Sequence, residues 1–161
     1  MSSQVLSEQS IGTQAFGALL RAHMSATKQL NAQLVADHGL TLSDYGVLLQ
    51  LAWAPDRRLR RIDLAEKILL TASGITRLLD GLERSGFVER AACDTDRRVV
   101  YAVLTDRGLA KLREAAATHV EQIEGLFGRR FEPSELETLV TLLGRLGDEG
   151  SADACEPPEE S

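Results

Sequence analysis

TASGITRLLDGLERSG, residues 71–86, is the most informative stretch of this sequence. When its residues are placed at 100° intervals around a helix axis, apolar side chains fill one arc and polar side chains the opposite arc. The apolar set is Ile75, Leu78, Leu79 and Leu82, and the polar set is Ser73, Thr76, Arg77, Asp80 and Arg84. Thr71 is a suitable N-cap, and Ser85-Gly86 is a suitable end. The stretch therefore predicts a helix with one buried face and one solvent face.

The segments beside this helix predict a second helix and a β-hairpin. A short helix is expected in IDLAEKILL, residues 62–70. FVERAA (87–92) and RRVVYAVL (97–104) are rich in β-branched and aromatic residues, and the turn-forming CDTD separates them. A short helix, a tight turn and a longer helix form a helix-turn-helix, whose second helix enters the major groove of DNA. The hairpin would be the wing of that module.

Longer helices are predicted on both sides of the module, because apolar residues recur at spacings of three and four. Their boundary signals are Gly39 after a first helix over about 8–37, Thr41 with Asp44 before a second, Ala54-Pro55 after it, Thr105 before a fifth and Pro133 at the start of a sixth. The terminal helices are too apolar for isolated surface helices and need a partner. The predicted fold class is mainly α with a small β-hairpin wing: a winged helix-turn-helix plus a helical dimerisation region.

The net charge of −6 at first argues against a nucleic-acid partner. Residues 40–107, however, contain 11 Lys and Arg against 10 Asp and Glu, whereas residues 146–161 contain six acids and no base. The end of the chain therefore accounts for the whole acidic excess. We expect a disordered acidic tail over 149–161 and a flexible N-terminus over 1–9.

Several classes of protein are not expected from this sequence. No apolar run approaches the roughly 20 residues of a membrane-spanning helix, and the N-terminus lacks the features of a signal peptide, so a cytoplasmic protein is expected. Cys93 and Cys155 form no CxxC pair, and His23, His38 and His119 show no ligand spacing, so no metal site is predicted. Because no nucleophile motif, phosphate loop or paired carboxylates occur, neither an enzyme nor a cofactor is expected.

The polar residues around the predicted module suit DNA. Ser and Thr can bond to a base edge or a phosphate, and Arg can pair bidentately with guanine. Arg97 and Arg98 lie at the predicted wing tip, where they could reach phosphate or the minor groove. A basic run before the third helix comprises Arg57, Arg58, Arg60 and Arg61. It could hold phosphate beside the site or be a solvated loop, and both alternatives stay open.

Over roughly residues 10–148 the chain resembles the MarR family of bacterial regulators. The resemblance is carried by LTLSDYGVLLQL, LAEKI, TASGITRLLDGLERSGFVER and DTDRRVVYAVLTDRG, followed by a long final helix pair. It implies a winged helix-turn-helix over about 40–107, with dimerisation helices over about 10–38 and 105–148 that interlock in a homodimer. It further implies a pseudo-palindromic DNA site and, by default, repression.

The resemblance also assigns roles to particular residues. It implies that Ser73, Thr76 and Arg77 face bases and phosphates, that Arg97 is the wing-tip arginine, and that Asp96 braces the wing. The expected DNA-contacting set is Ser73, Thr76, Arg77, Arg84, Arg97, Arg98, Arg60 and Arg61. Cys93 departs from the family, many of whose members carry an Asp before a Pro there.

Members of the family commonly bind small aromatic or anionic effectors between the dimer helices and the winged module. The aromatic and polar candidates for such contacts are Arg21, His23, Tyr45 and Trp53. Two alternatives to a ligand-responsive repressor remain open. One is a redox-responsive regulator acting through Cys93, and the other is a winged-helix module that binds proteins without reading DNA.

Overall fold

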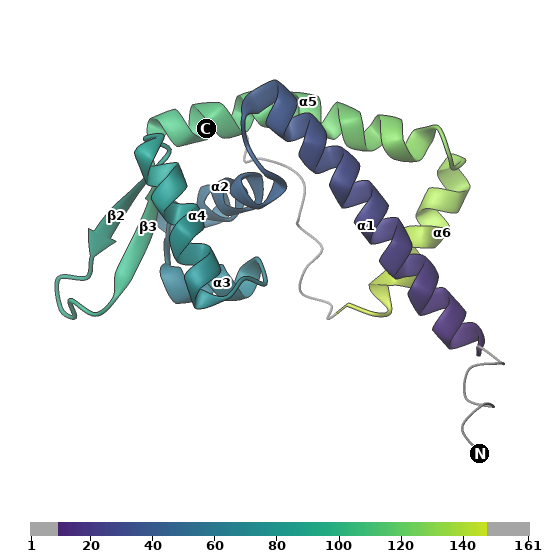
Figure 1. Ribbon diagram of the computed structural model, residues 1–161, viewed down its shortest axis with the longest axis horizontal. Helices are drawn as coiled ribbons and strands as arrows, with labels where there is room; N and C mark the ends of the chain where they lie inside the picture. Colours follow the sequence, from purple (N-terminus) through teal and green to yellow (C-terminus); the bar gives the residue numbers. More distant parts are fainter. Residues whose placement is uncertain (1–9, 148–161) are drawn as a thin grey trace, which may run out of the picture.

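The computed structural model describes residues 10–147, so the predicted flexible segments 1–9 and 149–161 lie outside the described residues (Figure 1). The elements are α1 (Ile11–His38), α2 (Leu42–Trp53), the short 3-10 helix η1 (Pro55–Arg57), β1 (Arg58–Arg60), α3 (Arg61–Lys67), α4 (Ala72–Arg84), β2 (Val88–Ala92), β3 (Val100–Leu104), α5 (Asp106–Gly128) and α6 (Pro133–Gly144). The predicted class is confirmed: a mostly helical chain with a small antiparallel sheet.

The helix boundaries follow the predicted capping residues. At α2, the Thr41 N–H donates to Asp44 Oδ2 (2.8 Å) while the Asp44 N–H donates to Thr41 Oγ1 (3.1 Å), which is the predicted capping box. Thr71 accepts from the Gly74 N–H at α4 (3.1 Å), and Thr105 accepts from the Gly108 N–H at α5 (2.9 Å). These bonds satisfy N–H groups that a helix start would otherwise leave free.

The core lies around α2, where the predicted buried face of α4 packs. Val47, Leu48 and Leu51 of α2 are all fully buried, and Ile75 is only 1% exposed. Leu79 and Leu82 are also buried, and Leu78 packs against the same cluster from its edge. The amphipathic division of residues 71–86 is therefore confirmed on its apolar side.

The sheet has three strands in the order β1-β3-β2, whereas only the β2–β3 hairpin was predicted. The added strand β1 pairs antiparallel with β3, with Arg58 opposite Val103 and Arg60 opposite Tyr101. Residues 58–60 of the basic run thus form a strand and not a loop, although Arg58 and Arg60 stay exposed as a solvated segment would be. Three residues carry too little alternation to indicate a strand, and the pairing depends on a partner far along the chain.

Helix α3 ends at Lys67, three residues before the predicted end at residue 70. The Leu69 N–H donates to Glu66 O (3.3 Å) and the Leu70 N–H donates to Ala65 O (2.9 Å), which is the Schellman closure of a helix. Leu69 takes the left-handed position with φ 54°, where glycine is usual, and its side chain is 91% exposed. The tight turn of the helix-turn-helix therefore begins here.

The start of α5 is packed against the start of the wing. Thr105 Oγ1 donates to Gly86 O (2.7 Å), and the Thr105 N–H donates to Phe87 O (3.1 Å). A Cβ at Gly108 would lie 2.1 Å from Phe87 O, closer than any side chain can approach main-chain oxygen. Only glycine allows this contact, which joins α5 to the hairpin.

The opposite end of the molecule buries little. We define the helical end as residues 11–25 of α1, residues 120–128 of α5 and the whole of α6, which converge away from the winged module (Figure 1). Of the predicted apolar face of α1, Leu30 and Leu34 are buried, but Phe16 is 66% exposed. Helix α6 contains no buried residue. Across residues 10–147, none of the helices has the length and apolar character needed to cross a membrane.

Candidate nucleic-acid interface

The solvent face of α4 presents the side chains that were predicted to meet DNA. Ser73, Arg77 and Arg84 are exposed and Thr76 is half-buried. Thr76 Oγ1 donates to Ala72 O (2.8 Å), which fixes the hydroxyl on the first turns of the helix. Within residues 10–147, neither Arg77 nor Arg84 forms a hydrogen bond or an ion pair, so both guanidinium groups are available to a ligand.

The wing tip is a turn over residues 93–99 that Asp96 organises. Its carboxylate accepts from the Arg98 N–H (3.0 Å) and from Arg98 Nε (3.4 Å), and its carbonyl accepts from the Val99 N–H (3.0 Å). Arg97 is exposed and has no such partner in the described part of the chain. The turn therefore holds Arg98 against its own carboxylate and leaves Arg97 projecting.

Cys93 lies at the base of the same turn and is half-buried. Its sulfur lies 3.2 Å from Thr95 Oγ1, and this hydrogen bond, with backbone bonds from Thr95 and Asp96, lowers the pKa of the Cys93 thiol below its ordinary value. The described residues contain no second cysteine that could form a disulfide with it.

The basic run crosses from η1 through β1 to the start of α3, and each of its arginines has a contact within the chain. Arg57 Nη1 donates to Asp106 (2.9 Å), and the Arg58 guanidinium lies 4.0 Å from the centre of the Tyr101 ring. Arg60 donates bidentately to Asp63 at 2.7 and 2.8 Å, which raises the pKa of its guanidinium. These three arginines therefore anchor the sheet and α3.

Arg61 is the member of the run that reaches the solvent face of α4. Its Nη1 donates to Thr76 Oγ1 at 3.5 Å, a long hydrogen bond, and the side chain is exposed. Arg60 and Arg61 were both predicted to contact DNA. The structure brings Arg61 next to Thr76 and keeps Arg60 on Asp63.

Arg90 is a charged residue of the site that sequence reasoning missed. From β2 its guanidinium pairs with the Asp80 carboxylate, and its Nε lies 3.0 Å from Glu83 Oε2. Both carboxylates belong to α4, one turn apart. Opposite charges ten residues apart were visible in the sequence, but nothing there indicated that the strand returns beside the helix.

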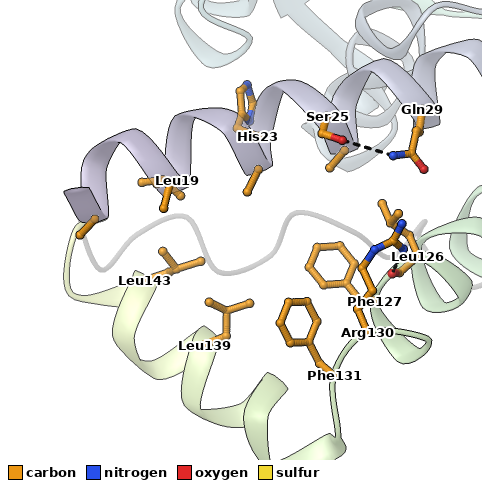
Figure 2. A pocket seen from close by; sticks show the side chains of 14 residues that line it. Leu19, His23, Ser25, Gln29, Leu126, Phe127, Arg130, Phe131, Leu139 and Leu143 are labelled. Carbon is orange, nitrogen blue, oxygen red and sulfur yellow. Dashed lines mark hydrogen bonds between the residues drawn. The ribbon is translucent and has the colours of Figure 1, made fainter. Parts of the chain in front are cut away.

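The four candidate effector contacts do not line one cavity. A cavity of about 660 Å³ lies between α1, α5 and α6, where Leu19, Leu139 and Leu143 face Phe127 and Phe131 (Figure 2). His23 borders it, but Arg21, Tyr45 and Trp53 do not. Trp53 is partly buried against the core.

Tyr45 is instead buried between α2 and α5, with its ring centre 4.7 Å from that of His119. His119 is itself only 5% exposed, and burial lowers its pKa. Its Nδ1 and the Oε1 of Gln122 are buried without a hydrogen-bond partner in the described part of the chain. No group of three or more potential metal ligands occurs among residues 10–147.

Comparison with known proteins places this geometry in a family. The model of the MarR family matches residues 38–99, which include α2, α3, α4 and β2. The HTH-type transcriptional regulator MhqR of Bacillus subtilis is 33% identical over 132 residues, which cover 82% of this chain and 88% of the relative. The HTH-type transcriptional repressor YetL of the same organism is 34% identical over 111 residues, covering 69% of this chain and 66% of that protein.

A solved structure agrees with these matches over nearly the whole chain. Sco3205, a MarR family transcriptional regulator from Streptomyces coelicolor determined in complex with DNA, is 28% identical with a TM-score of 0.78, covering 94% of this chain and 95% of that one. The family model spans the helix-turn-helix, and MhqR matches the surrounding helices as well. The chain therefore belongs to the MarR family of transcription regulators.

Proposed function

We propose that this protein binds double-stranded DNA as a homodimer, at a pseudo-palindromic operator, and represses transcription until a small effector weakens the complex. The observation that carries the proposal is the free solvent face of α4. Arg77 projects from it with no hydrogen bond or ion pair among residues 10–147, and Ser73 is exposed with its hydroxyl 3.3 Å from Thr71 Oγ1, opposite a buried apolar face. This is the arrangement of a recognition helix.

The contacts proposed for DNA divide into two kinds. Ser73, Thr76 and Arg77 read base edges or adjacent phosphates, because hydroxyls and guanidinium groups can bond to both. Arg97 at the wing tip, with Arg98 behind it, contacts the backbone or a narrow minor groove. Arg84 and Arg61 add positive charge at the ends of this surface. Sco3205, a chain of the same fold, was determined in complex with DNA, which supports DNA as the ligand.

The proposed partner is a second copy of the chain, and the helical end supports it. Phe16 is 66%, Val140 73% and Leu142 48% exposed, so a lone chain would leave a large apolar surface in water. A two-fold axis through this end would set the two α4 helices about 34 Å apart, one turn of DNA. The inverted repeat of the proposed operator follows from that symmetry.

Repression and effector binding are proposed from two separate observations. A relative, YetL, is named a transcriptional repressor. The buried unpartnered atoms His119 Nδ1 and Gln122 Oε1 lie where α5 meets α1 and α2, and buried polar atoms generally have a partner. A small aromatic or anionic compound with a polar group could supply one at this junction.

The test begins with selection of duplexes from a random-sequence library by the full-length protein. We expect enrichment of an inverted repeat whose half-sites are about 10 base pairs apart, and a gel shift of that duplex that weakens steeply with salt. Sedimentation of the complex should show two chains per duplex. Failure to enrich any sequence, with no salt-sensitive shift, would overturn the proposal in favour of a protein-interaction module.

A further inference from the structure

Arg90 occupies an unusual place between the wing and α4. Side chains alternate along a strand, so Arg90 shares its face of β2 with the buried Val88, and that face meets α4. There the guanidinium bridges two carboxylates, Asp80 and Glu83, with its Nε 3.0 Å from Glu83 Oε2. The single guanidinium of Arg90 on β2 thus forms ion pairs with two carboxylates of α4.

The position of Asp80 on α4 gives this bridge a consequence for binding. At 100° per residue, Asp80 lies within about 60° of Arg77 and about 40° of Arg84 around the axis, on the face proposed to meet DNA. A carboxylate there repels the phosphates of bound DNA. Salt screens this repulsion only weakly, because groups in contact are closer together than the screening length of about 8 Å at physiological ionic strength. Helix α4 also carries Glu83, so its two arginines are fully offset by two acids.

The stability of the fold does not explain the bridge. The side chains of Arg90, Asp80 and Glu83 are 36%, 45% and 44% exposed. Ion pairs exposed to this extent contribute little to folding, because water screens them. Their effect on an approaching polyanion is larger, since charges at a binding surface set the association rate and the penalty for like-charge contact.

We propose that Arg90 is a positioning residue for DNA binding: it holds Asp80 and Glu83 in ion pairs and so offsets part of their negative charge beside the proposed DNA-facing side of α4. The inference rests on the proposed DNA-binding function. It assigns to Arg90 no contact with DNA, and it predicts that the two carboxylates harm binding more when Arg90 is absent than when it is present.

The experiment compares Arg90→Gln with the triple variant that also carries Asp80→Asn and Glu83→Gln. Binding is measured by fluorescence anisotropy on the selected duplex and on a random duplex of equal length. We expect Arg90→Gln to weaken both complexes by about tenfold, and the triple variant to recover to within about threefold of the wild type. Neutral amides cannot re-form the ion pairs, so a bridge that only held β2 on α4 would not be rescued.

Two results would overturn the inference alone, with the wild type still binding. One is unchanged binding of Arg90→Gln. The other is a loss that the triple variant does not recover, with a salt slope lowered by about one, which would show that Arg90 itself contacts phosphate. A wild type that binds neither duplex would overturn the proposed function as well.

A second variant decides the question if Arg90→Gln does not fold, as judged by circular dichroism and thermal unfolding. Asp80→Asn with Glu83→Gln in the wild-type background frees Arg90 and removes two acids. We expect a several-fold tighter complex with the random duplex. Unchanged or weaker binding of this variant would contradict the inference.

Discussion

The winged module, α2 through β3, and the helical end meet the demand for apolar burial in different ways. In the module, Leu48 and Leu64 are completely buried and Ile75 nearly so. At the helical end, α6 contains no buried residue, and Val140 is 73% exposed. One region completes its core within a single chain, and the other leaves apolar surface exposed, which fits the proposed second copy. The difference teaches that the residues that build the core and those available for the proposed assembly lie in separate parts of this sequence.

The largest expected effect is loss of the module's core. Leu48→Ala should lower the free energy of unfolding by about 2–5 kcal/mol, because it removes buried methyl groups and leaves a cavity. Urea unfolding followed by circular dichroism measures this, and the loss should not depend on protein concentration. Val140→Ala is the matched control. Its cost should shrink as the protein is diluted, because a bound partner stabilises the folded chain by an amount that grows with concentration, and Val140 is 73% exposed in the single chain. Concentration-independent costs in both variants would break the comparison.

Breaking the helical end should abolish assembly without unfolding the module. Leu139 and Leu143 line the cavity between α1, α5 and α6, so glutamate at both positions places charge in the proposed contact. We expect a monomer by sedimentation and a loss of operator affinity of about hundredfold, because two half-sites are no longer engaged together. Glu137→Gln, a change on an exposed part of α6, is the control. A double variant that remains dimeric would contradict the assignment of this surface.

Within the module, α4 and the wing should respond differently to loss of an arginine if they contact DNA as proposed. Arg77→Ala should reduce discrimination between the selected and a random duplex by about tenfold, whereas Arg97→Ala should weaken both complexes alike and lower the salt slope by about one. Anisotropy titrations at several salt concentrations separate the two patterns. Equal effects of both substitutions on specific and random DNA would show that this division is wrong.

The smallest effect concerns His119, which lies where the two regions meet. Burial lowers its pKa in the folded chain below the ordinary value of 6.5. The unfolded chain therefore binds the proton more tightly, so stability should fall as the pH drops below about 6.5. His119→Gln should reduce this dependence, measured as the difference in urea midpoint between neutral and mildly acidic buffer. An unchanged pH dependence in the variant would assign the titration to other groups.

Local chemistry explains which parts of the fold could be predicted. Thr41, Thr71 and Thr105 cap helices with their own neighbours, and the spacing of Ile75, Leu79 and Leu82 fixes the buried face of α4. Strand β1 was missed because it exists only through pairing with β3, some forty residues along the chain. The end of α3 before Leu69 was not predicted, because the residue with left-handed backbone that follows a helix is usually glycine.

The site shows the same limit. The exposed residues of α4 follow from helical periodicity, and the placement of Arg97 follows from the hairpin. The pairing of Arg90 with Asp80 and the stacking of Tyr45 on His119 are tertiary contacts, which no spacing rule contains. Tyr45 was taken as a possible effector contact for its chemistry, but its position makes it part of the core.

Gly108 has a mechanical consequence. Because there is no space for a Cβ between α5 and Phe87 O, the start of α5 packs directly on the start of the wing, and we expect the two to move together. Helix α5 has 23 residues and is about 35 Å long, so a tilt of about 5° about its C-terminal end moves its N-terminal end, beside the wing, by about 3 Å. In a symmetric pair the two wings would swing in opposite directions and the displacement would double. A small displacement of the helices at the helical end would thus produce a larger mismatch between the two winged modules and the helical repeat of DNA.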